Sequence, residues 1–265
     1  MKIGFIGTGN MGTALANAVS KSGMDAQLFF ADFFAEKAQS LAEELKGTAA
    51  DNLTLIEACD MVFLGVKPQV LPSLLEEIRE AVLARNGALT LVTMAAGIPV
   101  ASIQKGIGKS VPVIRIMPNT PVAVGEGVIA YCTENVSEET EKVFVKSLSK
   151  GGLVQKIEES KIDAASALHG CGPAFVYLFI EALADGAVAC GLPRDTALSF
   201  AAKTVKGAAE MVLETGKHPG ALKDAVTSPG GTTIQGVRVL EEQGFRGAAM
   251  DAVIAAYEKT LALGK

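Results

Sequence analysis

The sequence predicts an α/β N-terminal domain with a doubly wound sheet, followed by an all-α C-terminal domain. Three observations predict this fold class. Short apolar runs alternate with segments of helical periodicity up to about residue 157, and the strand signal disappears after about residue 161. The length of 265 residues is sufficient for two small domains, for which we expect residues 1–160 and 161–265.

The N-terminal elements are predicted in alternating order. Strands are expected where short apolar runs are rich in β-branched or aromatic side chains, and helices where apolar residues recur at helical spacing. The predicted strands are residues 2–6, 28–31, 61–66, 89–94, 111–117 and 128–132. The predicted helices between them are residues 11–22, 36–45 and 71–84. This alternation is typical of βαβ units that form a buried parallel sheet.

The C-terminal third shows helical patterns and no strand pattern. The predicted helices are residues 162–190, 195–214, 233–243 and 247–262. Gly191 and Pro193 stand where the first of them ends, as helix-stop residues do. Several apolar, alanine-rich helix faces in a domain of only about 100 residues exceed what so small a unit buries alone. We therefore expect this domain to pack against a second copy of the chain.

Composition and charge exclude several classes of protein. With 49% hydrophobic and 20% charged residues, the chain is globular rather than disordered. A net charge of −5 without a basic stripe argues against a nucleic-acid partner. The apolar run 171–192 contains Glu181 and Asp185, so we expect no membrane span, and glycines interrupt the N-terminal apolar run, so we expect no secretory leader. Four cysteines without C-x-x-C spacing indicate reduced thiols, a cytoplasmic protein and no metal site.

A glycine-rich segment joins the first predicted strand to the first predicted helix. Gly7, Gly9 and Gly12 form the pattern G-x-G-x-x-G in that context, which is typical of Rossmann-type dinucleotide-binding domains. The first glycine permits a tight turn, the second lets a pyrophosphate approach the backbone, and the third packs the helix on the strand. The helix N-terminus adds free N–H groups and a positive dipole end. The pattern therefore predicts an NAD(P) site, and the alternative is a tight turn that binds no ligand.

Asp32 lies 20 residues after Gly12, at the end of the second predicted strand. An acidic side chain at this place accepts a hydrogen bond from the adenosine ribose 2′-OH, whereas a 2′-phosphate would face a like charge. Phe33 follows where an arginine would favour that phosphate, and Lys37 is the nearest cation. We therefore expect NADH to be favoured over NADPH. The alternative is that Asp32 only caps the helix that begins near Ala35.

Two further strand ends carry candidate cofactor residues. Residues 65–68 follow the third predicted strand and residues 94–96 follow the fourth. The carboxyl ends of parallel strands line the cofactor crevice, so Lys67 can face phosphate, ribose or nicotinamide there. The small residues Ala95 and Ala96 suit the close approach of a flat ring. A solvated loop lysine and ordinary turn packing are the alternatives.

A second glycine-rich segment, residues 227–233, precedes a helix in the C-terminal domain. Two glycines and several hydroxyls at a helix N-terminus make an anion-binding nest without a charged side chain. A small carboxylate would be held by the backbone N–H groups of Gly231, Thr232 and Thr233. The alternative is an ordinary threonine cap.

Taken together, the motifs resemble the pyrroline-5-carboxylate reductase family from one end of the chain to the other. The segments that carry the resemblance are residues 4–12, 66–68, 95–97, 115–121, 170–175, 192–194 and 219–241. The most specific are Met-Pro-Asn-Thr-Pro at 117–121 and Ser-Pro-Gly-Gly-x-Thr at 228–233. The resemblance implies reduction of L-1-pyrroline-5-carboxylate to L-proline, the last step of proline biosynthesis, with NADPH or NADH.

The resemblance also implies roles for individual residues. Thr233 would be the catalytic residue, with its hydroxyl near the ring nitrogen, while Gly230, Gly231 and Thr232 would bind the substrate carboxylate. The cofactor-binding residues expected from the motifs and the resemblance are Ile6, Gly7, Thr8, Gly9, Asn10, Met11, Gly12, Asp32, Asn52, Gly65, Val66, Lys67, Pro68, Met94, Ala95 and Ala96. Family members form homodimers through the helical domain, and many assemble further into decamers.

The chain departs from the family pattern at three places. Asp32 and Phe33 replace a polar pair, which puts a preference for NADP in doubt, and Ala225 replaces an asparagine that contacts the cofactor in some relatives. His169 stands where many relatives have serine. A lone histidine can act as a general acid, or it can pack or cap at a helix start.

Two other functions are open to this sequence. A 3-hydroxyacid dehydrogenase has the same two-domain plan but relies on a catalytic lysine in the helical domain, and Lys161, Lys203, Lys206 and Lys223 stand in no motif of that kind. A protein that only senses NAD(P) has no use for the second nest at residues 230–233.

Overall fold

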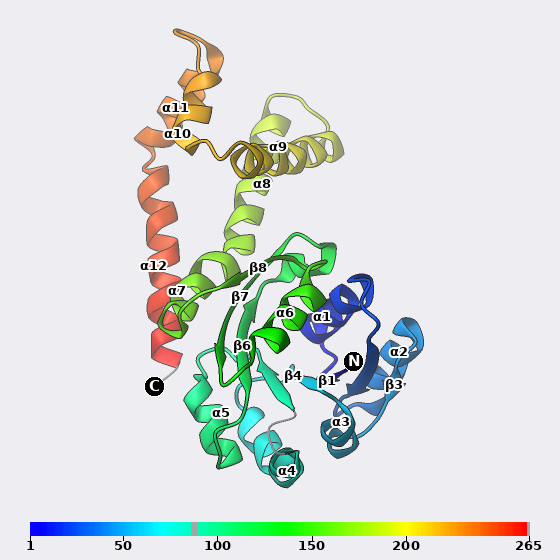
Figure 1. The fold of residues 1–265 in the computed structure, drawn as a ribbon. Helices are drawn as coiled ribbons and strands as arrows, with labels where there is room; N and C mark the ends of the chain where they lie inside the picture. Colours follow the sequence, from blue (N-terminus) through cyan, green and yellow to red (C-terminus); the bar gives the residue numbers. More distant parts are fainter. Residues whose placement is uncertain (86–88, 264–265) are drawn as a thin grey trace. The chain divides into compact units, whose positions relative to one another are not determined.

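The computed structural model describes residues 1–85 and 89–263, and the chain separates into two compact units (Figure 1). Unit 1 comprises Met1–Cys171 together with Ala256–Lys265, and unit 2 comprises Gly172–Ala255. The division of the chain into domains of residues 1–160 and 161–265 stays a prediction, and its last two residues lie outside the described part.

Unit 1 is built on an eight-stranded sheet with the order β3-β2-β1-β4-β5-β6-β7-β8. The strands are β1 (Lys2–Ile6), β2 (Gln27–Ala31), β3 (Thr48–Ala49), β4 (Met61–Leu64), β5 (Thr90–Thr93), β6 (Val113–Pro118), β7 (Gly127–Glu134) and β8 (Gly152–Lys156). From β3 to β6 all neighbouring strands pair in parallel. The strand order reverses between β1 and β4, which is the topological switch point at which doubly wound sheets bind ligands.

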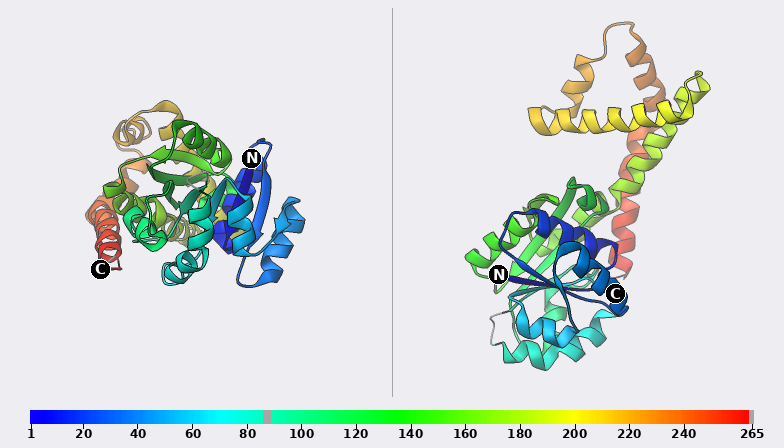
Figure 2. Two further views of the ribbon diagram at one scale, coloured as in Figure 1. Left: turned by 60° about the horizontal axis from the view of Figure 1, so that its bottom comes forward. Right: turned by 90° about the vertical axis from the view of Figure 1, so that its right-hand side faces the viewer.

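Helices cover both faces of this sheet, as the doubly wound prediction requires (Figure 2). One face is covered by α1 (Asn10–Lys21), α2 (Ala35–Leu45) and α6 (Glu138–Leu148). The other is covered by α3 (Asn52–Ala58), α4 (Leu71–Ala84), α5 (Val100–Ile107) and α7 (Ile162–Ala165). Because the central strands are buried on both faces, their sequences are continuous apolar runs such as 61–64, and this made them visible in the sequence.

The prediction of a parallel sheet is wrong for one pair of strands. β6 and β7 are antiparallel, with Arg115 opposite Cys132. Only residues 119–126 connect them, including the 3-10 turn η1 (Thr120–Val124), and a parallel crossover needs about a dozen residues or more. β8 then pairs in parallel with β7 after α6. The six predicted strands and three predicted helices of this unit are present with ends within two residues, whereas β3, β8, α3, α5 and α6 were not predicted.

Unit 2 is helical, as predicted. Its helices are α8 (Gly172–Ala189), α9 (Arg194–Thr215), α10 (Pro219–Ala225), α11 (Thr232–Glu242) and most of α12 (Phe245–Leu263).

The single helix predicted over residues 162–190 is interrupted. A 3-10 turn, η2 (Glu159–Lys161), and α7 are followed by a π-helical turn, η3 (Ser166–Gly170), before α8 begins. Cys171 N–H reaches back five residues to Ser166 O at 3.2 Å, and Pro173, in the first turn of α8, has no N–H to donate.

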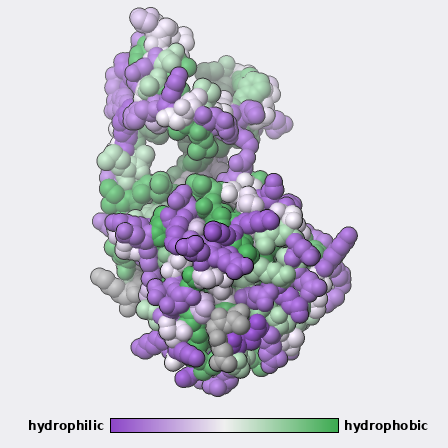
Figure 3. Space-filling view, viewed as in Figure 1, coloured by the Kyte–Doolittle hydropathy of each residue, from purple (hydrophilic) through white to green (hydrophobic). Residues whose placement is uncertain are grey.

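Unit 2 buries few side chains. The buried cluster consists of Ala184, Ala197 and Ala201, where α8 and α9 pack together. Larger apolar side chains lie open on the same helices and appear green in Figure 3. The stretch Glu159–Ala189 is long and apolar enough to cross a membrane by length and composition alone.

Candidate functional site

The predicted cofactor residues of unit 1 follow the carboxyl ends of five neighbouring parallel strands. Ile6 is the last residue of β1, and residues 7–12 follow it. Asp32 follows β2, Asn52 begins the helix after β3, and residues 65–68 and 94–96 follow β4 and β5. Because these strands are adjacent and parallel, the structure brings the residues to one edge of the sheet. Two backbone hydrogen bonds tie the strand ends together: Gly7 N–H donates to Ala31 O at 2.8 Å, and Gly65 N–H donates to Ile6 O at 2.7 Å.

The glycines of the first turn have the geometry that a dinucleotide needs. Gly7 has φ of +98°, and a Cβ on it would lie 2.6 Å from Gly65 O. A Cβ on Gly12 would lie 2.1 Å from Gly7 O, so only glycine lets the helix pack on the strand. A Cβ on Gly9, in contrast, would meet nothing within 4 Å in the described part of the chain. The space beside Gly9 is therefore open to a ligand that approaches the backbone.

Free backbone donors stand at the same place. Gly9 is the N-cap of α1, so the N–H groups of Asn10, Met11 and Gly12 in the first turn have no acceptor within the helix. Such donors and the positive end of the helix dipole bind phosphate groups. These residues therefore fit the pyrophosphate of a bound dinucleotide. Thr8 N–H is not among the free donors, because it donates to Asp32 Oδ2 at 2.7 Å.

The Asp32 carboxylate is held by the glycine-rich loop and by the start of α2. Its Oδ2 accepts from Thr8 N–H and, at 3.0 Å, from the Thr8 hydroxyl, while its Oδ1 accepts from Phe34 N–H at 3.0 Å. The N-cap of α2 is Phe34, so Asp32 is not merely a helix cap. Burial acts to raise the pKa of Asp32, but the hydrogen bonds from Phe34 and Thr8 and the charge of Lys37 outweigh it and lower that pKa. Asp32 is therefore ionised at neutral pH.

A cavity of about 540 Å³ lies beside Asp32 at the ends of β2 and β3. The residues lining it are Asp32, Ala35, Glu36, Ala38, Gln39, Ala49, Ala50 and Asp51. Hydrogen bonding to Thr54, chiefly its backbone N–H, lowers the pKa of Asp51, which caps α3. The cavity thus carries negative charge, which suits ribose hydroxyls better than a phosphate.

The surroundings of this cavity offer little positive charge. Lys37 Nζ lies 5.0 Å from the centroid of the Phe34 ring, and Phe33 is 96% exposed. Asn52, a predicted cofactor residue, donates from Nδ2 to Glu77 Oε1 at 3.0 Å. The Asn52 amide is therefore already engaged by α4.

The ends of β4 and β5 complete this edge. Lys67 is exposed, and its carbonyl accepts from Val70 N–H at 2.9 Å as the chain turns into α4. Ala95 is buried and Ala96 is exposed at the end of β5. Lys67 and Ala96 are thus accessible at the same edge of the sheet as the glycine-rich loop.

The second predicted nest lies at the start of α11 in unit 2. Gly231 is the N-cap, no described side chain caps the helix, and Thr232 and Thr233 are its first two residues, both exposed. Thr233 is therefore not the helix cap. Gly231 N–H donates to Ser228 O at 3.0 Å within the turn. The donors left to face an anion are those of the first turn of the helix, beginning with Thr232 and Thr233.

His169 has a structural partner that the sequence did not reveal. Its Nε2 lies 2.7 Å from Met117 O, and because a carbonyl only accepts, Nε2 carries the proton. Asn119 Nδ2 donates to His169 O at 2.9 Å, and Asn119 Oδ1 accepts from Val128 N–H at 2.8 Å. The packing interpretation thus accounts for the His169 ring, which fixes the π turn to the end of β6.

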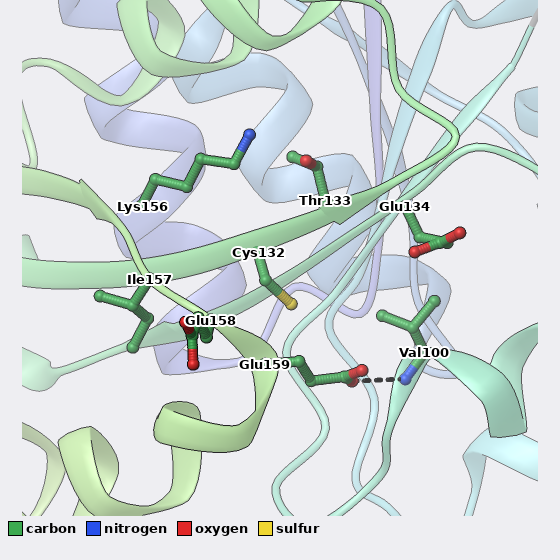
Figure 4. A pocket seen from close by; sticks show the side chains of 8 residues that line it. All are labelled: Val100, Cys132, Thr133, Glu134, Lys156, Ile157, Glu158 and Glu159. Atoms are coloured by element: carbon green, nitrogen blue, oxygen red, sulfur yellow. Dashed lines mark hydrogen bonds between the residues drawn. The ribbon is translucent and has the colours of Figure 1, made fainter.

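Sequence reasoning also missed an ion-pair network. Arg115, in β6 and 3% exposed, pairs through Nη1 with Glu159 Oε1 at 3.3 Å and through Nη2 with Asp163 Oδ1 at 2.9 Å. Glu159 Oε1 also accepts from Val100 N–H at 2.7 Å, the dashed line in Figure 4. The signal in the sequence was an arginine inside an otherwise apolar strand. The network ties α5 and α7 to the sheet.

A cavity of about 680 Å³ lies beside this network (Figure 4). The residues lining it are Val100, Cys132, Thr133, Glu134, Lys156, Ile157, Glu158 and Glu159, which differ from the predicted site residues. Burial, with the charge of Glu159, raises the pKa of the Cys132 thiol to about 11. The thiol is therefore protonated at neutral pH and is a poor nucleophile. Among the described residues, no group of three or more His, Cys, Asp or Glu side chains is arranged to hold a metal ion.

The fold and the glycine-lined edge define a Rossmann-type NAD(P)-dependent oxidoreductase. The family model described as NADP oxidoreductase, coenzyme F420-dependent, matches residues 2–96, and the model described as pyrroline-5-carboxylate reductase dimerisation matches residues 159–263. The chain belongs to the pyrroline-5-carboxylate reductase family. This membership decides against the 3-hydroxyacid dehydrogenase alternative.

Individual relatives match over their full length. The pyrroline-5-carboxylate reductase of Methanosarcina acetivorans is 40% identical, over 100% of this chain and 98% of the relative. That of Escherichia coli is 39% identical with the same coverage. The structure of Plasmodium falciparum pyrroline carboxylate reductase with NADP bound is 33% identical, with a TM-score of 0.86 over 100% of this chain and 98% of that chain. The Coxiella burnetii reductase is 32% identical, with a TM-score of 0.92 over 99% and 98%.

Proposed function

We propose that this protein reduces L-1-pyrroline-5-carboxylate to L-proline in the cytoplasm, the last step of proline biosynthesis, with NADH preferred over NADPH. The full-length identity of about 40% to proteins named pyrroline-5-carboxylate reductase carries the proposal of the reaction. The four free cysteines, two of them buried, are what we expect of a reducing compartment.

The substrate carboxylate is proposed to bind at the start of α11. Thr232 and Thr233 N–H, at the positive end of an 11-residue helix, would hold it, with Gly230 and Gly231 shaping the turn. Gly230 has φ of +69°, a conformation that favours glycine. Because Gly231 N–H is engaged with Ser228, its part is to shape the nest rather than to donate.

The chemistry asks little of the protein beyond orientation. The bound nicotinamide supplies the hydride. The exposed Thr233 hydroxyl is proposed to hydrogen-bond the ring nitrogen as its charge is lost, while the N–H groups of Thr232 and Thr233 fix the carboxylate and thereby select the face that is attacked. Positioning of this kind accounts for large rate enhancements without an acid–base cluster.

The cofactor preference follows from Asp32. At a separation of about 4 Å, two like charges repel by about 1 kcal/mol in water and about 4 kcal/mol at an effective dielectric constant of 20. These values correspond to roughly fivefold to thousandfold discrimination against a 2′-phosphate. The cavity beside Asp32, with Glu36 and Asp51 in its lining, supports the same preference.

The double substitution Asp32→Asn with Phe33→Arg tests this preference. It removes the like charge and supplies a guanidinium that can bind the 2′-phosphate in a bidentate way. We expect kcat/KM to shift toward NADPH, measured as the ratio for the two cofactors in wild type and variant. A wild-type protein strongly selective for NADPH would mean that Asp32 does not face the ribose.

Self-association is proposed to occur through unit 2. The match of residues 159–263 to a dimerisation model supports a homodimer, and so do the exposed apolar side chains of α8 and α9. Assembly of dimers into decamers rests on the family resemblance alone.

One spectrophotometric assay tests the reaction. Purified protein should oxidise NADH or NADPH in the presence of pyrroline-5-carboxylate, and L-proline should be identified as the product. A 3-hydroxyacid serves as the control substrate. Binding of NAD(P)H without turnover of the imine would favour the alternative of a nucleotide-sensing protein.

A further inference from the structure

Thr8 occupies the second position of the glycine-rich loop, and its side chain points away from solvent. It is 7% exposed. Its hydroxyl and its N–H both donate to the same oxygen, Asp32 Oδ2, at 3.0 and 2.7 Å. The loop that fits the pyrophosphate is thus joined directly to the acidic residue at the end of β2.

The hydrogen bonds of Asp32 leave one acceptor site open. An ionised carboxylate offers about four acceptor sites, two on each oxygen. The two donors of Thr8 fill those of Oδ2, and Phe34 N–H fills one of those of Oδ1. Oδ1 can therefore accept one more hydrogen bond, and a single ribose hydroxyl supplies it.

The orientation of this carboxylate also depends on Thr8. Rotation about the bond between Cβ and the carboxyl group of an aspartate is soft, so the plane of the group is set by its hydrogen bonds. Without the Thr8 hydroxyl, Oδ2 would regain an open acceptor site. The plane would then be held only by the N–H groups of Thr8 and Phe34.

We propose that Thr8 is a positioning residue for cofactor selection: it saturates Oδ2 of Asp32 and so presents Oδ1 alone to the adenosine ribose. The inference rests on the proposed binding of NAD(P)H with Asp32 toward the ribose. It adds that the choice between the two cofactors depends on the Thr8 hydroxyl through its hydrogen bond to Asp32.

Three variants separate the Thr8 hydroxyl from the loop around it. Thr8→Val keeps the shape and the N–H but removes the hydroxyl, and Thr8→Ser restores the hydroxyl. The matched control is Thr13→Val, because the Thr13 hydroxyl also bonds the loop, donating to Thr8 O at 3.0 Å, but does not touch Asp32. Thr8→Ala replaces Thr8→Val if that variant does not fold.

The first measurement is the ratio of kcat/KM for NADH and NADPH with pyrroline-5-carboxylate. Thr8→Val should lower the NADH:NADPH ratio about three- to tenfold, less than a complete charged hydrogen bond allows because the N–H remains. Thr8→Ser and Thr13→Val should stay within about twofold of wild type, the range of a substitution that leaves the contact intact. The absolute ratio of the wild type tests the proposed NADH preference, whereas the change on substitution tests the role of Thr8.

The second measurement needs no cofactor. The Asp32 carboxyl is titrated by carbon NMR in each variant, with Lys37 and Glu36 of α2 and Asp51 before α3 as its charged neighbours. Loss of a donor to the ionised form should move the titration to higher pH in Thr8→Val but not in Thr13→Val. The proposal is overturned by a folded Thr8→Val or Thr8→Ala variant with an unchanged ratio, by an unmoved titration, or by equal effects in Thr13→Val.

Discussion

Many large apolar side chains are buried against the sheet of unit 1, whereas those on the helices of unit 2 are largely exposed. In unit 1, Phe5 and Phe63 are buried on one face of the sheet, where their rings stack with centroids 4.7 Å apart. In unit 2, Phe200 and Leu213 on α9 are 61% and 76% exposed. Unit 1 therefore has a large apolar core on each face of its sheet, whereas the core of unit 2 is a small cluster between α8 and α9.

The difference shows where the stability of each unit comes from. Burial of apolar surface is the main favourable contribution to folding, and unit 1 obtains it within its own chain. Unit 2 buries three alanines, each with a single methyl group. Exposed apolar helix faces of this extent mark contact surfaces between proteins. The folding of unit 2 is therefore expected to depend on a second chain.

The strongest test of this contrast substitutes one phenylalanine in each unit. Phe63→Ala should lower the free energy of unfolding by about 3–5 kcal/mol, because it leaves a cavity in a closed core. Phe200→Ala should change it by less than about 1 kcal/mol in dilute protein, since the side chain is exposed in the single chain. Denaturant unfolding at several protein concentrations measures both. Equal losses at every concentration would show that unit 2 has a core of its own.

Thr233 should matter for turnover and not for folding. Thr233→Ala is expected to lower kcat/KM about 10–1000-fold, or roughly 1.4–4 kcal/mol, the range for one positioned hydrogen bond or proton relay. Its melting temperature should stay close to that of wild type, because the side chain is exposed and caps no helix. Gln235→Ala, on the same helix, is the control. Full turnover in Thr233→Ala would leave the hydroxyl without a catalytic part.

Assembly should be visible in the concentration dependence of stability. If folding of unit 2 is linked to dimerisation, each tenfold rise in protein concentration should add about 1.4 kcal/mol per dimer. Sedimentation measured at the assay concentration gives the oligomeric state of the active form. An active monomer would contradict the dependence of unit 2 on a partner.

The smallest effect concerns a partly buried ion pair of unit 1. Glu141 accepts from Lys156 Nζ at 2.8 Å and from the Tyr131 hydroxyl at 2.9 Å. The Lys156 bond chiefly lowers the pKa of Glu141 below 4.5, and it outweighs the opposing effect of burial. The stabilisation is therefore present above that value and is lost as pH falls through the lowered pKa. The advantage of wild type over Glu141→Gln, about 1 kcal/mol or less, should shrink as the pH is lowered through the lowered pKa of Glu141. An advantage independent of pH would mean that the charge of Glu141 contributes nothing.

The sequence predicts those strands, helices and loops whose formation depends on residues close together in the chain. β4 is buried on both faces, so residues 61–64 form a fully apolar run that predicts a strand. The loop needs glycine at Gly7 and Gly12, because a Cβ at either position would collide with a backbone oxygen. The helices α3 and α5, of seven and eight residues, are too short to establish a period. α6 could have been found, since Ser137 caps it and three glutamates follow in its first turn.

Contacts distant in the sequence could not be predicted. Arg115 and Asp163 pair across 48 residues, and His169 meets Met117 across 52. Local periodicity contains no information about such partners. The bond between Thr8 and Asp32 lies between two residues that were each singled out, but only the register of β1 and β2 shows that they meet.

The hairpin between β6 and β7 determines at which edge of the sheet the later segments of the chain arrive. Every passage across the sheet takes the chain from one edge to the other, so one reversal changes the edge at which all later segments arrive. Because β7 and β8 run against the other strands, β8 ends opposite the carboxyl edge, and the segment from α7 through the π turn returns to it. The bond from His169 to Met117, at the end of β6, marks that arrival. The polypeptide therefore leaves unit 1 at Cys171 on the same edge that holds the glycine-rich loop, and an even number of reversals would have sent it out on the far side.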